Sequence, residues 1–238
     1  MHCPAPKEGS TQLISPIQSS FVPGRQITDN VIVMQEALHS MRRKTGAKGW
    51  MAIKLDLEKA DDRIRWDFIQ ETLAQMRLPD QLIKVMMHCV SSCSLNILWN
   101  GEPTETFQPS RGIRQGDPLS PYLFVACMER LTQLIESKVA EGQWKTIPLS
   151  RGGTRISHLI FADDVVLFGE ASVEQAQNIM DCLRLFCAAS GQKISSQKSN
   201  VYFSPNTNVA VSAEVCNVLG IAQTEEFGRY LGVPTSKG

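Results

Sequence analysis

Two adjacent carboxylates lie between two apolar runs in the stretch Leu159-Ile160-Phe161-Ala162-Asp163-Asp164-Val165-Val166-Leu167-Phe168. Each apolar run has the length and composition of a short buried strand. A two-residue turn between the strands would place both aspartates at the tip of a hairpin. Crowded like charges are costly unless cations neutralise them, and hard divalent cations prefer oxygen ligands. The pattern indicates a Mg²⁺ site for phosphoryl or nucleotidyl transfer, and a solvent-exposed turn is the alternative.

The composition is that of a soluble globular protein. The chain has 238 residues, 42% of them hydrophobic and 20% charged. No apolar run approaches the roughly eighteen residues of a membrane helix, so we expect no membrane partner. The seven cysteines form no Cys-x-x-Cys pair and the four histidines are scattered, which favours reduced cysteines in an intracellular compartment, nucleus or cytoplasm. A formal net charge of zero argues weakly against a complete nucleic-acid-binding protein.

Helical and strand patterns alternate along the chain. The helical patterns cover residues 28–43, 66–77, 79–90, from Pro118 or Pro121 to about 139, 172–191 and a short stretch from 212. The strand patterns cover residues 50–57, a hairpin at Asn100-Gly101, a hairpin over 147–156, the hairpin around the two aspartates, and 199–203 and 229–232. This order predicts an α+β fold, an antiparallel sheet with helices on one face.

Asp56 is a second source of carboxylate. It lies on the polar face of the predicted strand 50–57, whose other face carries Met51, Ile53 and Leu55. If this strand pairs beside the 159–168 hairpin, Asp56 converges with the aspartate pair. Three carboxylates can then hold two Mg²⁺ ions about 4 Å apart, the geometry for in-line displacement at phosphorus.

The loop Arg111-Gly112-Ile113-Arg114-Gln115-Gly116-Asp117-Pro118 fits the same chemistry. Its glycines free backbone amides, and together with Arg111 and Arg114 these suit phosphates or a strand backbone. Gln115 can hydrogen-bond the edge of a nucleotide. The alternative is a helix-entry loop with solvated arginines.

Five motifs in order resemble the reverse transcriptase of non-LTR retrotransposons, and most closely the LINE-type elements of plants. They are Phe21 through Asn30, Lys54 through Ala60, Arg111 through Pro121, Phe161 through Asp164, and Tyr230-Leu231-Gly232. The resemblance implies a right-hand polymerase palm with part of the fingers. It also implies RNA-templated DNA synthesis from a primer 3′-hydroxyl, with deoxynucleoside triphosphates and two Mg²⁺ ions, or Mn²⁺ in their place.

The resemblance also assigns roles to single positions. Asp56 matches the metal-binding aspartate of the first palm motif, and Asp163 and Asp164 match the catalytic pair. Gln115 and Gly116, with Arg114 beside them, match a loop that contacts template and nucleotide. Tyr230-Leu231-Gly232 resembles the primer grip, and either Lys193 or Lys198 corresponds to a later lysine-bearing motif.

Asp61 departs from the family pattern. The position five residues after Asp56 is normally Tyr or Phe, and the resemblance implies that this ring stacks beneath the incoming sugar and excludes a 2′-hydroxyl. Asp61 lacks the ring and places a further negative charge near a triphosphate. In a partly dry site that repulsion can reach several kcal/mol. Such a change suits a decaying genomic copy.

The resemblance gives the following organisation. Residues 1–13 are expected to be a disordered stub, residues 14–49 and 68–110 partial fingers, and residues 50–67 and 111–238 mainly palm. The thumb and an endonuclease are expected to be lost regions of the parent polyprotein. Two other functions are considered: a catalytically dead relic with at most weak nucleic-acid binding, and a cyclase-like nucleotidyl transferase, against which the motifs at 21–30 and 111–121 argue.

Overall fold

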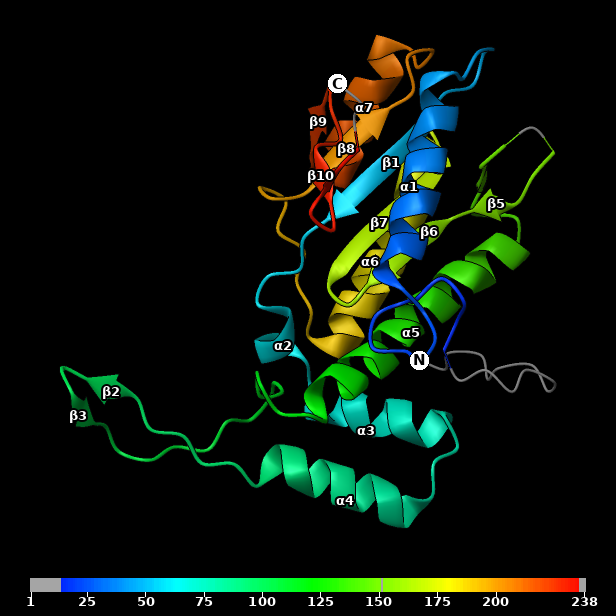
Figure 1. The fold of residues 1–238 in the computed structure, drawn as a ribbon. Coiled ribbons are helices and arrows are strands. Elements are labelled where there is room, and N and C mark those ends of the chain that lie inside the picture. Colours follow the sequence, from blue (N-terminus) through cyan, green and yellow to red (C-terminus); the bar gives the residue numbers. More distant parts are fainter. Residues whose placement is uncertain (1–13, 151, 236–238) are drawn as a thin grey trace.

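A central sheet organises the fold in the computed structural model, which describes residues 14–150 and 152–235. Its strand order is β6-β7-β1-β8-β9 (Figure 1). The strands are β1 (Trp50–Leu55), β6 (His158–Phe161), β7 (Asp164–Glu170), β8 (Asn200–Phe203) and β9 (Ala222–Thr224). The expected stub, residues 1–13, lies outside the described part of the chain. Within that part, no helix has the length and apolar composition needed to cross a membrane.

The first face of the sheet carries the larger core. Alternate residues of β1, Met51, Ile53 and Leu55, are almost fully buried there. They join a cluster with helices α3 (Trp66–Gln75), α5 (Ser120–Ala140), α6 (Val173–Ser190) and α7 (Val209–Leu219). These apolar contacts support the strand that ends at Asp56.

Helix α1 (Ile27–Arg42) covers the second face, so the expectation of helices on one face is corrected (Figure 1). Met34, Leu38 and Met41 of α1 pack with Ala52 and Phe168, and none of the five is measurably exposed. A second correction concerns strand direction. β8 and β9 run parallel, while the other pairs in this sheet are antiparallel. The α+β class itself is as expected.

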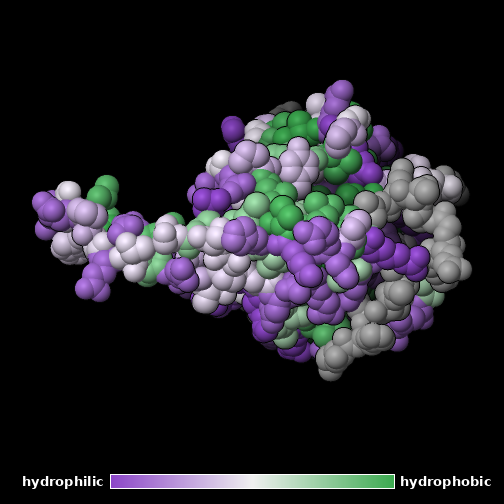
Figure 2. All heavy atoms as spheres, turned by 90° about the horizontal axis from the view of Figure 1, so that it is seen from below, coloured by the Kyte–Doolittle hydropathy of each residue, from purple (hydrophilic) through white to green (hydrophobic). Residues whose placement is uncertain are grey.

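A long arm projects from the body between α4 (Asp80–Ser91) and the 111–118 loop (Figure 1). It ends in strands β2 (Leu98–Trp99) and β3 (Glu102–Pro103), joined by the expected Asn100-Gly101 turn, in which both residues have positive φ. Leu98 and Trp99 are 73% and 71% exposed at its end. Figure 2 shows the arm standing clear of the body, with apolar and polar side chains mixed along it.

The remaining elements are short. A single-turn helix, α2 (Ala60–Arg63), connects β1 to α3. Two small hairpins lie outside the main sheet: β4 (Ile147–Pro148) with β5 (Arg155–Ile156), and β10 (Arg229–Tyr230) with β11 (Val233–Pro234). The capping residues of α6 are as expected, because Ser172 Oγ accepts the Gln175 backbone N–H and Gly191 closes the helix in a left-handed conformation.

Candidate active site

The turn between β6 and β7 contains one aspartate, not two. Phe161 pairs with Asp164, so Ala162 and Asp163 form the turn and Asp164 is the first residue of β7. Ala162 takes a positive φ of 52°, which two-residue hairpin turns require. The expected position of both carboxylates at the tip is therefore corrected. Asp163 is exposed at the tip, and Asp164 is half-buried within the sheet.

Asp56 lies near Asp164. The register of β1 and β7 pairs Leu55 with Val165, Asp56 and Asp164 are the next residues along the two chains, and the charge of Asp56 acts on Asp164. Two hydrogen bonds fix the Asp56 backbone. Its N–H donates to Ser199 Oγ at 3.1 Å, and its carbonyl accepts the Ser195 N–H at 2.9 Å. The expected pairing of this strand beside the hairpin is confirmed.

The acidic residues crowd one another electrostatically. Burial raises the pKa of Asp164, and the charges of Asp163 and Asp56 raise it further, while Lys54 opposes them. The pKa of Asp61 is also raised, first by burial and then by Asp163 and Asp62. Even so, within residues 14–150 and 152–235 no three acidic, histidine or cysteine side chains are arranged to hold a metal ion together.

The 111–118 loop is docked against α2 by its backbone. The Gly112 N–H donates to the Ile64 carbonyl at 2.7 Å, and the Ile113 N–H to the Asp61 carbonyl at 2.9 Å. Gly112 has a φ of +88°, and a Cβ there would lie 2.8 Å from the Asp62 carbonyl oxygen. Only glycine satisfies both conditions without strain.

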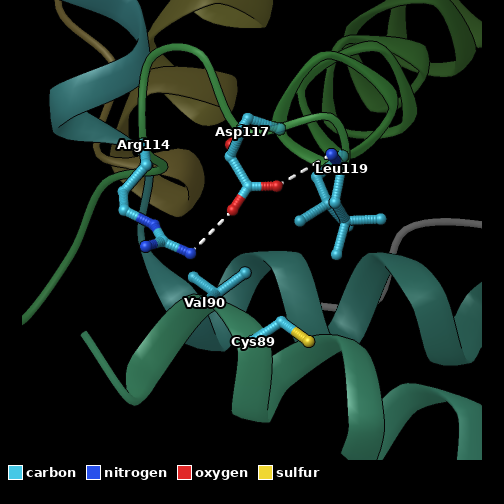
Figure 3. A pocket seen from close by; sticks show the side chains of 7 residues that line it. Cys89, Val90, Arg114, Asp117 and Leu119 are labelled. Carbon is cyan, nitrogen blue, oxygen red and sulfur yellow. Dashed lines mark hydrogen bonds and ion pairs between the residues drawn. The ribbon is translucent and has the colours of Figure 1, made fainter.

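Asp117 connects this loop to α5. One of its carboxylate oxygens accepts the Leu119 N–H at 2.9 Å, and the other accepts Arg114 Nη2 at 2.7 Å. Figure 3 shows this ion pair next to Val90 and Cys89 of α4, where it lines a small cavity of about 10 Å³. Arg114 is thereby held close to the cleft described next.

A cleft of about 370 Å³ brings the predicted site together. Six of the residues proposed for the site line it, whereas Asp56 does not: Asp61, Arg114, Gln115, Gly116, Asp163 and Asp164. Asp61, at the position of the missing aromatic ring, therefore shares this cleft with the aspartate pair. Six further residues line it without a site role assigned from the sequence: Phe21, Ser120, Pro121, Phe124, Phe161 and Ala162. Phe21 is the first residue of the motif at 21–30. No local sequence pattern predicts that its ring is exposed at the cleft.

Lys193 lies beside the end of β1. Its ammonium forms an ion pair with Glu58 at 3.0 Å, and its carbonyl accepts the Glu58 N–H at 2.8 Å. Of the two candidate lysines, Lys193 is the one with a side-chain ion pair among the described contacts. The assignment of the later motif to Lys193 or Lys198 stays a prediction.

The β10–β11 hairpin, which contains the expected primer grip, is attached to the same strand. Lys54 Nζ donates to the Arg229 carbonyl at 2.8 Å. Tyr230 is 1% exposed, and Leu231 and Gly232 form its tight turn with positive φ. Burial raises the pKa of Tyr230, and the charge of Asp164 adds to the effect. The hairpin therefore lies within electrostatic range of the aspartate pair.

Known proteins resemble this chain in both sequence and fold. A protein of transposon TX1 from Xenopus laevis, itself uncharacterized, is 30% identical over 191 residues, 79% of this chain and 14% of that protein. A retrovirus-related Pol polyprotein from the type-2 retrotransposable element R2DM of Drosophila melanogaster is 28% identical over 184 residues, 77% of this chain and 16% of that protein. An uncharacterized mitochondrial protein of Arabidopsis thaliana is 51% identical over 65 residues, 27% of this chain and 53% of that protein.

The fold agrees with solved structures of telomerase. Telomerase from Candida albicans, solved with a fragment of telomeric RNA, superposes with a TM-score of 0.58 at 10% identity, covering 82% of this chain and 32% of that one. Telomerase from Candida tropicalis gives a TM-score of 0.54 at 13% identity, covering 79% and 30%. This likeness confirms the expected right-hand polymerase fold.

The sequence matches the reverse transcriptase (RNA-dependent DNA polymerase) family over residues 6–235. The expected resemblance to reverse transcriptases of non-LTR retrotransposons is confirmed by this match and by the retrotransposon relatives. The chain belongs to the reverse transcriptase family.

Proposed function

We propose that this chain is the palm and part of the fingers of an RNA-directed DNA polymerase, which joins a deoxynucleoside triphosphate to a primer 3′-hydroxyl on an RNA template. One observation carries the proposal. Asp56 directly follows Leu55, which pairs with Val165 next to Asp164, and Asp164 and Asp163 line a cleft of about 370 Å³ that is also lined by the Gln115-Gly116 loop. The chain spans 14% to 16% of the TX1 and R2DM relatives, so the activities of those whole proteins are proposals here.

The residues present suit divalent cations by their chemistry. Reverse transcriptases generally use divalent metal ions, and carboxylate oxygens are the ligands that Mg²⁺ prefers. Burial raises the pKa of Asp164 most and the charges of Asp163 and Asp56 add to it, and a bound cation would relieve the repulsion among these carboxylates. We propose that Asp56, Asp163 and Asp164 hold two Mg²⁺ ions, with Mn²⁺ as a substitute. Such ions, when bound, neutralise phosphate charge and lower the pKa of an attacking hydroxyl.

The other cleft residues position the substrates in this proposal. Arg114, held by Asp117, presents its guanidinium to a phosphate, and the Gln115 amide hydrogen-bonds a base edge. Gly116 allows the backbone to approach the nucleic acid closely, since it has positive φ and open space on the side where other residues carry a Cβ. We further propose residues 14–49 and 68–110 as mainly partial fingers and residues 50–67 and 111–238 as mainly palm.

The test is primer extension by the full chain, with an RNA template, an annealed DNA primer, deoxynucleoside triphosphates and Mg²⁺ or Mn²⁺. We expect Asp163→Asn to reduce extension about a hundredfold or more, as removal of a group that stabilises transition-state charge does. Glu36→Gln, which changes an exposed carboxylate on α1, serves as the matched control. Equal extension by the chain and Asp163→Asn would refute the proposed role of the aspartate pair.

Asp61 favours a second candidate, a relic that binds primer–template without extending it. Its carboxylate lies in the cleft where the family has a ring. Asp61→Asn removes the charge and keeps the shape, whereas Asp61→Tyr restores the ring. Salt-dependent binding without extension in all three proteins would support the relic. Extension gained by both variants would identify charge repulsion as the defect, and extension gained by Asp61→Tyr alone would identify the missing ring.

A further inference from the structure

Two exposed aromatic rings contact each other, one of them lining the cleft, although neither is part of the buried core. Phe21 is 54% exposed and lines the cleft, and Tyr122, in the first turn of α5, is 57% exposed. Their ring centroids lie 6.5 Å apart with the planes at 63°, an edge-to-face pair. Large aromatic side chains left partly in water are typical of contact surfaces, because their faces can still bury apolar area against a ligand.

The backbone holds Phe21 in place at a conformational cost. Its φ is 54°, a region that residues with a Cβ rarely adopt. The segment 14–25, here called the strap, is fixed on both sides of it. Arg25 donates to the carbonyls of Ile14, Ser15 and Gln18, and the Ser15 N–H donates to Glu129 of α5 at 3.0 Å. Residues held in such conformations concentrate at ligand contacts.

The chemistry of the cleft indicates what these rings contact. The cleft combines carboxylates, an arginine and an amide with the aromatic residue Phe21. A ligand that satisfies all of them carries phosphate, a hydrogen-bonding edge and a flat apolar face. A nucleobase has such a face, and base–aromatic stacking tolerates any base sequence because every base has one.

We propose that the Phe21 ring, supported edge-to-face by Tyr122, is a stacking platform for an unpaired base of the template strand as it reaches the cleft. This inference rests on the proposed function and specifies how the template is received. An incoming nucleotide brings a triphosphate that Arg114 and the aspartates can hold, whereas an unpaired template base has no such anchor and depends on stacking. The strap therefore acts as a fixed template guide.

The test measures stacking without catalysis. The full chain is mixed with a primer–template whose first unpaired template base is the fluorescent analogue 2-aminopurine, in EDTA and without nucleotide. We expect the wild-type chain to quench the fluorescence. Phe21→Ala and Tyr122→Ala should lose the quenching and bind about tenfold more weakly, in line with stacking contributions measured by alanine substitution. Phe21→Trp should stay within about twofold of wild type.

Two further variants separate stacking from structure. Trp99→Ala removes an aromatic ring that is 71% exposed on the distant arm, and it should quench and bind like wild type. Phe21→Leu keeps an apolar side chain without a flat face, and it should lose the quenching while its circular dichroism and melting temperature stay unchanged. Wild-type quenching and binding in Phe21→Leu would overturn the proposal. So would a Phe21→Ala defect that arises only after nucleotide and Mg²⁺ are added, because the ring would then contact the incoming nucleotide.

The outcome also separates this inference from the proposed function. Quenching by a wild-type chain that extends no primer supports the platform and refutes the polymerase activity. Extension by a wild-type chain that produces no quenching refutes the platform alone.

Discussion

Glu129→Gln should change how the stability of the protein depends on pH. Glu129 is 5% exposed on α5, and its Oε2 accepts the Ser15 N–H at 3.0 Å, which ties the strap to the helix. The pKa of Glu129 is raised from 4.5 to about 7, chiefly by burial. The hydrogen bond from Ser15 and the charge of Arg25 lower this pKa, and the charge of Glu136 raises it. Because the folded state holds this proton more tightly than the unfolded state, the associated stability is complete below pH 4.5. It is lost as the pH rises to about 7.

The magnitude follows from the two pKa values. One pKa unit corresponds to about 1.4 kcal/mol, so the raised pKa of Glu129 makes the free energy of unfolding fall by up to about 3 kcal/mol across this pH range. A glutamine stays neutral at every pH, and its oxygen can still accept the Ser15 N–H. The free energy of unfolding of Glu129→Gln, relative to wild type, should therefore rise by up to about 3 kcal/mol between pH 4.5 and pH 8.

Urea denaturation followed by tryptophan fluorescence, at several pH values between 4.5 and 8, measures this difference. The other titrating groups are present in both proteins, so their contributions cancel in the difference between the two free energies of unfolding. Glu36→Gln, at an exposed position of α1, is the control. Its free energy of unfolding should differ from that of wild type by the same amount at every pH. A difference between Glu129→Gln and wild type that does not change with pH would refute the reasoning. It would mean that Glu129 is solvated in the folded protein and that the strap is not packed on α5.

Three further substitutions test the packing around the site and the sheet. Gly112→Ala should lower the free energy of unfolding by about 1–3 kcal/mol in urea denaturation, because its φ is +88° and the added Cβ would meet the Asp62 carbonyl oxygen at 2.8 Å; an unchanged midpoint would contradict this. His158 is fully buried with its pKa lowered to about 4, so its contribution to stability is lost as the pH falls from 6.5 toward 4. His158→Leu should remove up to about 3 kcal/mol of that pH dependence, and an unaltered slope in acid titrations would count against it. Ser199→Ala removes the acceptor of the Asp56 N–H and should cost about 1–2 kcal/mol in thermal denaturation, whereas a neutral result would show that water replaces the hydroxyl.

Local signals predicted the elements whose ends depend on local chemistry. Ser172 and Gly191 delimit α6 because a cap hydroxyl and a left-handed glycine act within one helical turn. Asn100-Gly101 forms its hairpin turn for the same reason. The turn at Ala162-Asp163 was misplaced by one residue. Its register depends on the pairing of Phe161 with Asp164, and the sequence alone permits either choice.

Long-range packing decided what the sequence could not. The apolar side chains of α1 gave no indication of which face of the sheet they cover, and the parallel pairing of β9 depends on the path of the chain through α7. The carboxylates of the candidate site could be predicted from the sequence because their motifs are specific. The proximity of Asp61 to Asp163 arises only when α2 folds against the hairpin, and Phe21 reaches the cleft only because the strap crosses to α5.

The backbone around Asp61 explains why its charge stays in the cleft. On one side, the Asp61 carbonyl accepts the Ile113 N–H at 2.9 Å. On the other, the carbonyl of the preceding Ala60 accepts Gln192 Nε2 at 2.7 Å, and Gln192 is itself 4% exposed. A backbone held from both sides fixes the position of the Asp61 Cα, so its carboxylate stays within reach of the cleft that it lines. The departure at Asp61 is therefore a change in electrostatics on a backbone that neighbouring hydrogen bonds hold, and any loss of turnover that it causes should be reversible at this single position.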